Sequence, residues 1–215
     1  QYARYRGLIE ADLKPSVPAV ANWSMASLPR ALSAVELQRL LASCERGTAV
    51  GRRNWAILLL LARLGLRAGE VTALTLDDID WAAAELCIQG AGVSANRLPL
   101  PHEVGAALAD YLRHERPTTS NPAVFVRRLA PHDQPICADA IARVIRDAYQ
   151  RIGLPHSRTH ALRHTLACRL LQHGSSLKEV ADVLRHRSLN TSLIYAKLDN
   201  SKLAAVALPW PGSAS

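Results

Sequence analysis

Apolar residues recur three and four positions apart along most of the chain, a spacing that places them on one face of a helix. Boundary residues support this pattern. Ser33 with Glu36, and Ser176 with Glu179, have the spacing of a capping box at two helix starts. Gly47 and Gly65 are expected to end two helices. We therefore predict a mostly helical protein. The expected helices cover approximately residues 33–46, 52–64, 70–74, 102–116, 138–151, 159–173, 177–185 and 191–197.

The hydrophobic period changes between residues 76 and 100. Three short segments, at about 76–81, 85–89 and 97–100, are separated by Asp-rich and Gly-rich turns. Such segments are typical of a small antiparallel sheet. The predicted fold class is therefore mostly α with a small three-stranded antiparallel β-sheet.

Proline residues separate the start of the chain from its main domain. Pro15, Pro18 and Pro29 interrupt an extended stretch that follows a short helical pattern. We interpret residues 1–30 as the end of a missing N-terminal domain plus a linker. The main folded domain is then expected at 31–197, with a C-terminal segment after it.

The charge favours a polyanionic partner. Lys and Arg number 26 against 18 for Asp and Glu, which gives a formal net charge of +8. Only four of the 26 are lysines, and arginine binds phosphate through paired hydrogen bonds that lysine cannot copy. A GC-rich coding sequence would also raise the arginine share. The charge therefore points first to nucleic acid without requiring it.

The sequence does not support a membrane, secreted or zinc protein. The longest apolar run, residues 55–62, is too short to span a bilayer, and no basic-then-apolar leader opens the chain. The cysteines lack the CxxC spacing of a metal site. We expect small, buried thiols in a reduced, cytoplasmic protein. These cysteines are Cys44, Cys87, Cys137 and Cys168.

Arg67 and Glu70 form the first cluster of candidate functional residues. Arg67 follows a predicted buried helix, and Glu70 lies three residues further on. A surface ion pair within one helical turn would explain this pair equally well.

The second cluster lies at the start of the helix predicted near residue 159. His160 and Arg163 are three residues apart, so one helix face could direct an imidazole and a guanidinium at a single phosphate. His160 and His164 also have the spacing of a helical zinc site. However, Ala161 stands where a metalloprotease needs its glutamate, so we interpret His164 as a core or supporting histidine.

The last two clusters follow in order. His186 lies in a basic helix end, which by itself is often only a solvated turn, and Tyr195 comes nine residues later, where a lone tyrosine is more often part of a core. Each cluster alone has an ordinary structural explanation. The order of all four, from Arg67 through His160-x-x-Arg163 to these two residues, is more specific and indicates a common function.

This ordered set resembles the tyrosine recombinase (phage integrase) family, in its Xer-like bacterial branch. The resemblance covers about residues 28–207 and includes the words Leu-Gly-Leu-Arg, His-x-Leu-Arg-His-Thr and Leu-x-His-x-Ser. It implies a tyrosine recombinase catalytic-domain fold for residues 31–197. It also implies a site-specific recombinase that cleaves and rejoins DNA, and the C-terminal wording is similar to recombinases of bacterial mobile elements.

The resemblance also implies a role for each matching residue. Tyr195 would attack a DNA phosphorus and form a 3′-phosphotyrosyl link. Arg67 and Arg163 would bind the non-bridging oxygens, whose negative charge grows in the transition state. His160 and His186 would add hydrogen bonds to the same phosphate. The covalent link stores the bond energy, so no cofactor and no metal are expected.

The resemblance also bears on Glu70 and Ala91. Glu70 would orient Arg67 or His160. Ala91 occupies the place of the family's catalytic lysine, in a turn between the second and third predicted strands. That lysine would protonate the leaving oxygen, and the nearby Arg97 is a poor proton donor, so we expect impaired but not absent cleavage.

The implied partner is double-stranded DNA, bound by a homo- or hetero-tetramer of recombinase subunits. The segment 198–209 would dock on a neighbouring subunit, or pack within its own. Two other functions stay open: a non-catalytic DNA-binding or regulatory relative on the same scaffold, favoured by Ala91, and a type IB topoisomerase-like enzyme that relaxes DNA without exchanging strands.

Overall fold

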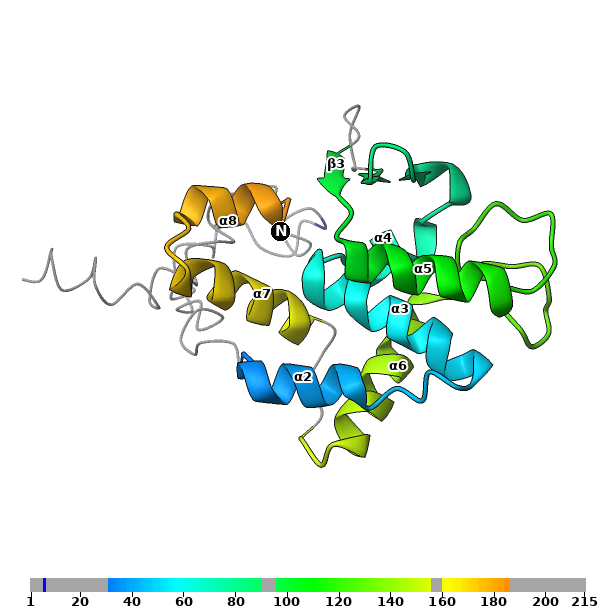
Figure 1. Ribbon diagram of the computed structural model, residues 1–215, viewed down its shortest axis with the longest axis horizontal. Coiled ribbons are helices and arrows are strands. Elements are labelled where there is room, and N and C mark those ends of the chain that lie inside the picture. The colour runs from blue at the N-terminus through cyan, green and yellow to red at the C-terminus, as the bar shows by residue number, and fades with distance from the viewer. Residues whose placement is uncertain (1–5, 7–30, 90–95, 156–159, 186–215) are drawn as a thin grey trace, which may run out of the picture.

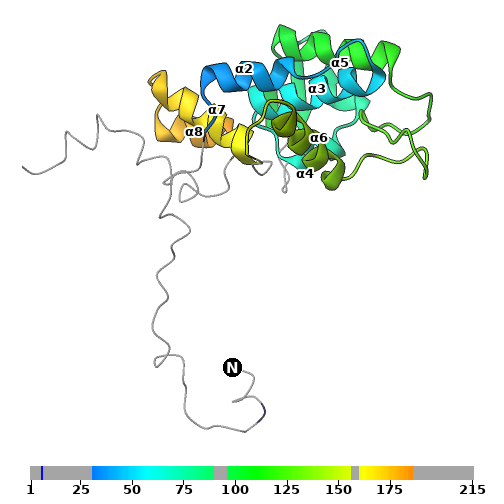
Figure 2. The ribbon, with the colours of Figure 1, turned by 90° about the horizontal axis from the view of Figure 1, so that it is seen from below.

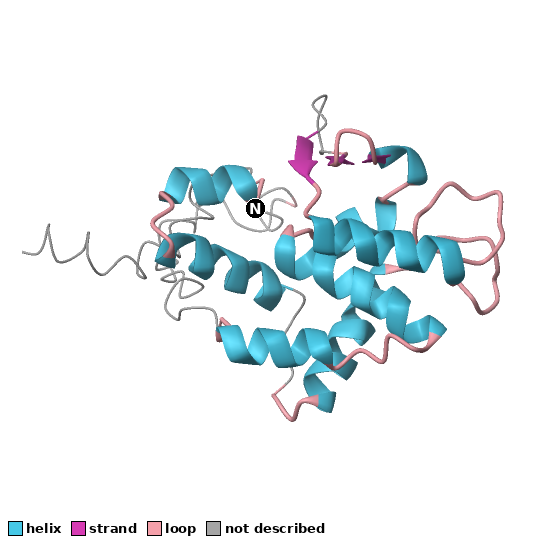
Figure 3. Ribbon diagram, in the orientation of Figure 1, coloured by secondary structure: helices cyan, strands magenta, loops and turns pink. Residues whose placement is uncertain are grey.

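The computed structural model describes residue 6 and residues 31–89, 96–155 and 160–185. These residues form a helical domain with one small sheet at its edge, as Figures 1 and 3 show, which confirms the predicted fold class. The helices are α2 (Ala34–Ala42), α3 (Ala49–Arg63), α4 (Ala68–Ala73), α5 (His102–His114), α6 (Ala138–Arg151), α7 (His160–Gln172) and α8 (Leu177–Val183).

Helix α3 forms the centre of the core. It packs against α5, α6 and α7, and every residue from Ala56 to Ala62 is buried. A helix that is apolar all round is stable only when it is enclosed in this way. Figures 1 and 2 show α3 between its neighbours in both views. The helix begins three residues earlier than predicted, because the Thr48 side chain accepts a hydrogen bond from the Gly51 amide and caps it.

The sheet has the order β1–β2–β3 and is antiparallel throughout. Its strands are β1 (Ile79–Asp80), β2 (Glu85–Ile88) and β3 (Asn96–Pro99). The prediction of a strand over 76–78 is wrong: these residues form the 3₁₀ turn η3 (Leu76–Asp78). The Asp78 carboxylate accepts hydrogen bonds from the Thr75 amide and hydroxyl, which closes the chain into a turn.

The predicted end of the first helix at Gly47 is wrong: α2 ends at Ala42, because the amide and hydroxyl of Ser43 bond to carbonyls of its last turn. Other predicted helix boundaries are confirmed. The capping box of Ser33 and Glu36 is formed, as is a second one of Ser176 and Glu179. Gly65 follows α3 in the left-handed region, with φ +58°, where glycine avoids a steric penalty. The predicted helix at 191–197 and both terminal segments lie outside the described residues.

The cysteine prediction holds in part. Cys44 and Cys168 are buried, and all four cysteines are free thiols. Cys137 is exposed, against the prediction, because it stands in the loop immediately before α6 and not on a core-facing helix position. Cys87 is only partly buried, on β2.

Helices α7 and α8 form one end of the domain in both Figure 1 and Figure 2. Between them lies a small apolar cluster separate from the main core, made by Ala167, Cys168, Val180 and Leu184. Leu162 joins α7 to the main core instead. In the described part of the chain, no helix is long and apolar enough to cross a membrane.

Replacing Gly65 with alanine is expected to lower the free energy of unfolding by at least about 2 kcal/mol. A Cβ there would lie 2.8 Å from Leu184 Cδ2 and 3.0 Å from Leu166 Cδ2, on a backbone with positive φ. Gly69→Ala is the matched control, since its Cβ would meet nothing within 4 Å. Chemical denaturation of both variants checks this, and equal stability of the two would contradict it.

Candidate active site

Arg67 stands at the N-cap of α4, where two groups hold its guanidinium. Glu70 Oε1 accepts a hydrogen bond from Arg67 Nη1 at 2.6 Å, and Glu70 Oε2 accepts one from the Arg67 amide at 2.8 Å. Arg67 Nη2 donates to the carbonyl oxygen of Arg185, at the end of α8, at 3.0 Å. The side chain is still 38% exposed. Arg67 is therefore fixed at two points and remains open to solvent.

Glu70 is more than a surface partner of Arg67. Its side chain is 14% exposed, and its Oε2 also forms a 2.9 Å ion pair with Arg185 Nη2. Burial raises the pKa of the Glu70 carboxyl, but the hydrogen bond from the Arg67 amide and the charge of Arg185 outweigh burial and lower the pKa below its usual value. The predicted pair of Arg67 and Glu70 is thus formed, and it is joined to α8.

Arg163 is buried, with 5% of its surface exposed. Its Nη1 donates to the carbonyl oxygen of Gly65 and its Nη2 to that of Leu184. These two bonds tie α7 to the turn before α4 and to the end of α8. Because Leu184 and Arg185 are consecutive, the two candidate phosphate-binding arginines bond to neighbouring carbonyls at a single chain turn.

His160 is exposed at the first position of α7, one helical turn before Arg163. His164 is partly buried, and its ring centroid lies 6.5 Å from that of His160. Burial, together with electrostatic interaction with His160 and Arg163, lowers the pKa of His164 to about 4. His164 is therefore neutral at pH 7, as a supporting histidine should be. Among the described residues, no group of three or more His, Cys, Asp or Glu could hold a metal ion.

The lowered pKa of His164 predicts a pH-dependent stability. The unfolded state binds a proton below about pH 6.5, but the folded state does so only near pH 4. Stability is therefore complete above pH 6.5 and falls as the pH drops toward 4, by up to about 3 kcal/mol. Thermal unfolding between pH 7 and pH 4 measures this loss. His164→Gln should flatten the profile and His102→Gln, at an exposed site, should not; parallel profiles for all three proteins would contradict the assignment.

Three predicted site residues lie outside the described residues: Ala91, His186 and Tyr195. The structure brings together Arg67, Glu70 and Arg163 and places His160 one turn away on α7. Sequence reasoning missed Arg185, which it treated only as part of a basic helix end. The signal was weak, since nothing in the local sequence points to a carboxylate 115 positions away.

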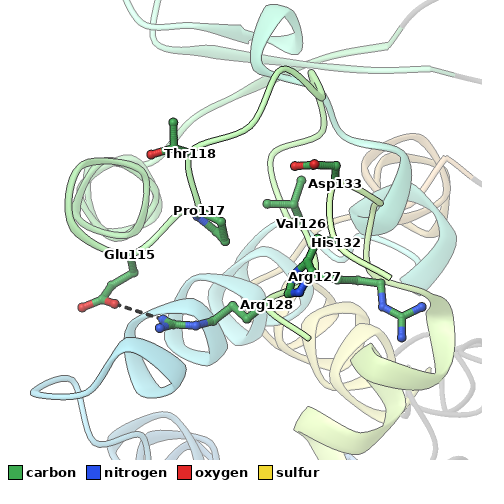
Figure 4. A pocket seen from close by; sticks show the side chains of 8 residues that line it. All are labelled: Glu115, Pro117, Thr118, Val126, Arg127, Arg128, His132 and Asp133. Carbon is green, nitrogen blue, oxygen red and sulfur yellow. Dashed lines mark hydrogen bonds and ion pairs between the residues drawn. The ribbon is translucent and has the colours of Figure 1, made fainter. Parts of the chain in front are cut away.

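A concavity of about 370 Å³ lies beside the loop after α5. Figure 4 shows Glu115 and Arg128 among its lining residues, joined by an ion pair; Arg128 Nη1 lies 3.3 Å from Glu115 Oε2. This loop is at the opposite end of the domain from α7 and α8 in Figures 1 and 2. The described residues that line it include no tyrosine or cysteine. It offers no nucleophile of the kind predicted, so the cluster around Arg67 is the stronger candidate.

Comparison with known proteins agrees with this geometry. A model of the phage integrase family matches residues 30–202. The chain belongs to the phage integrase family. The protein y4rA of Sinorhizobium fredii, named as an integrase or recombinase, is 46% identical over 99% of this chain and 52% of its own length. Tyrosine recombinase XerC of Azotobacter vinelandii is 34% identical over 83% of this chain and 59% of its own length.

Solved structures of this family have the same fold. XerH recombinase, in a post-cleavage complex with a palindromic difH substrate, superposes with a TM-score of 0.74 at 25% identity, covering 91% of this chain and 57% of that one. XerA recombinase gives a TM-score of 0.69 at 27% identity, covering 94% and 69%. The chain thus has the catalytic-domain fold of a tyrosine recombinase, and it spans about half the length of the first two curated relatives that it matches.

Proposed function

We propose that the chain is the catalytic part of a site-specific tyrosine recombinase that cleaves and rejoins duplex DNA. One observation carries the proposal: Arg67 and Arg163 bond to the consecutive carbonyls of Arg185 and Leu184. This chain turn leads directly into His186, nine residues before Tyr195. The fixed positions of the two guanidiniums support the proposal, in which His186 and Tyr195 complete the site.

The reaction follows from these groups. The Tyr195 oxygen attacks a backbone phosphorus, and the bond between that phosphorus and the 5′ oxygen of the next nucleotide breaks. The products are a 3′-phosphotyrosine and a 5′-hydroxyl. A 5′-hydroxyl then attacks the phosphotyrosine and releases the enzyme. Arg67 and Arg163 stabilise the charge that develops on the non-bridging oxygens, and His160 and His186 donate to the same phosphate.

The partner in this proposal is double-stranded DNA. The net charge of +8 favours a polyanion, and the Tn1549 transposon integrase, a structural neighbour, was solved in a complex with DNA. Exchange of strands requires two duplexes, so the working form is a homo- or hetero-tetramer of recombinase subunits, with residues 198–209 docking on a neighbour. In this proposal residues 31–197 are the catalytic domain, residues 1–30 end a DNA-clamping domain, and the substrate belongs to a bacterial mobile element.

A covalent-adduct assay tests the proposal. A binding site is first selected from a pool of random duplexes by the chain itself, and the selected duplex is nicked beside the cleaved phosphate so that the released strand diffuses away. The native chain should then give a protein–DNA band on a denaturing gel, and Tyr195→Phe should give none. Binding without any band from the native chain would contradict the proposal. Relaxation of plain supercoiled plasmid, without the selected site, would favour a topoisomerase instead.

A second candidate is a DNA-binding protein on this scaffold that does not cleave. Ala91 favours it, because the family's general-acid lysine is absent from that position. The same selected duplex separates the two candidates. Binding of equal strength by the native chain and Tyr195→Phe, with no adduct from Ala91→Lys either, would support the non-catalytic function.

A further inference from the structure

Arg185 adopts a conformation that its residue type disfavours. It follows α8 with φ +52°, in the left-handed region, although it is not glycine. Its side chain is only 7% exposed. A strained backbone persists where surrounding interactions hold it in place, and such residues cluster at functional sites. The contacts of Arg185 show what holds it.

The side chain of Arg185 turns back toward α4. Its Nη2 lies 2.9 Å from Glu70 Oε2 and 3.4 Å from the Gly65 carbonyl oxygen, and its Nη1 donates to the Val183 carbonyl at 3.0 Å. Its own carbonyl accepts the hydrogen bond from Arg67 Nη2 at 3.0 Å. Arg67, Glu70 and Arg185 therefore form a closed ring, in which each residue bonds to the other two.

The ring contains two positive charges and one negative charge. The carboxylate of Glu70 faces the guanidiniums of both Arg67 and Arg185. The ion pair with Arg185 therefore offsets part of the negative charge of Glu70, which would otherwise act on Arg67 alone. Arg67 is the more exposed of the two cations, at 38% against 7%. A phosphate approaching from solvent would thus meet Arg67, whose orientation is set by the two buried groups behind it.

We infer that Arg185 is a positioning residue for Arg67. This role rests on the proposed function, in which Arg67 binds the phosphate that is cleaved. The backbone carbonyl of Arg185 fixes Arg67 Nη2, and its guanidinium holds Glu70 in the orientation that fixes Arg67 Nη1. Because a donor displaced by about 1 Å costs up to about 10²-fold in rate, a buried residue that never touches DNA controls the rate of cleavage.

Two variants test this role. Arg185→Gly removes the guanidinium and suits the positive φ, so the backbone turn is retained. Arg185→Lys keeps the charge but not the paired N–H groups, and it carries the test if the glycine variant does not fold. Arg113→Ala removes one exposed cation from α5 and controls for the change in net charge.

Two measurements are made on each protein. The first, without DNA, is the ¹H–¹⁵N heteronuclear NOE of Arg67 Nε, assigned with Arg67→Lys. The second is the rate of adduct formation on the selected duplex at saturating concentration, together with the Kd for that duplex. A merely structural role would leave the NOE of Arg67 unchanged in every folded variant.

The role predicts a lower Arg67 NOE in Arg185→Gly, a rate lower by about 10- to 100-fold, and a Kd within about threefold of the native value. Arg185→Lys should recover part of the rate, and Arg113→Ala should match the native chain. An Arg67 NOE that stays native in Arg185→Gly, or one that falls while the rate does not, would overturn the role. Absence of any Tyr195-dependent adduct would refute the proposed function, while the NOE without DNA would still decide whether Arg185 orders Arg67.

Discussion

Replacing Arg163 with alanine is expected to lower the free energy of unfolding by about 3 kcal/mol and to reduce adduct formation by at least about 10²-fold. The substitution leaves the Leu184 carbonyl without its buried donor and the Gly65 carbonyl with only the 3.4 Å bond from Arg185 Nη2. It also opens a cavity at a side chain that is 5% exposed. Both expected effects have one cause, because the same guanidinium joins α7 to the end of α8 and, in the proposed function, stabilises the charge on the phosphate. Chemical denaturation and the nicked-duplex assay measure them.

Arg169→Ala is the matched control for Arg163→Ala. Arg169 lies on the same helix but is only partly buried, and its loss should change stability by no more than about 0.5 kcal/mol. Arg163→Lys should recover little stability, since a single ammonium replaces a fork that reaches two carbonyls. If Arg163→Ala is as stable as Arg169→Ala, the two carbonyl bonds do not hold this end of the domain together.

Introducing lysine at residue 91 is expected to raise the rate of adduct formation by about 10²- to 10⁴-fold. Expulsion of the 5′ oxygen needs a proton, and the sequence from residue 90 to residue 97 contains no lysine to supply it. The Ala91→Lys variant is compared with the native chain on the same selected duplex. Ala91→Arg is the control, because a guanidinium adds the charge without being an effective acid.

A modified substrate separates proton donation from a general effect of charge. In a duplex whose bridging 5′ oxygen is replaced by sulfur, the leaving thiolate needs no proton. The native chain and Ala91→Lys should cleave that duplex at similar rates, although they differ on the unmodified one. If Ala91→Lys cleaves neither duplex faster than the native chain does, the lack of lysine at residue 91 does not limit the rate of cleavage.

The elements best predicted from sequence are those whose signals are local. The capping boxes at Ser33 and Ser176 depend on a side chain and an amide three residues apart, and the structure contains both. The strand predicted over 76–78 failed for a local reason as well. The Asp78 carboxylate accepts a hydrogen bond from the Thr75 amide, and that bond favours a turn over continued strand pairing.

The sequence named candidate site residues but not the contacts between them. Of the candidates Arg67, Glu70, His160 and Arg163, the structure joins Arg67, Glu70 and Arg163 at the end of α8. The ring through Arg185 could not be predicted, because it depends on a carbonyl and a carboxylate brought together by the packing of α7 and α8 near the start of α4. Such contacts follow from the tertiary fold and leave no periodic trace in the sequence.

Identification of the residue that becomes linked to DNA tests the central claim most directly. The adduct is digested with nuclease and trypsin, and cleavage after Arg187 and Lys197 releases the peptide 188–197, which contains Tyr195. Mass spectrometry should find a 3′-linked nucleotide on Tyr195, and the released strand should carry a 5′-hydroxyl that accepts phosphate from a kinase. A nucleotide on another residue of this peptide, such as Ser192, or a released strand with a 5′-phosphate, would contradict the account.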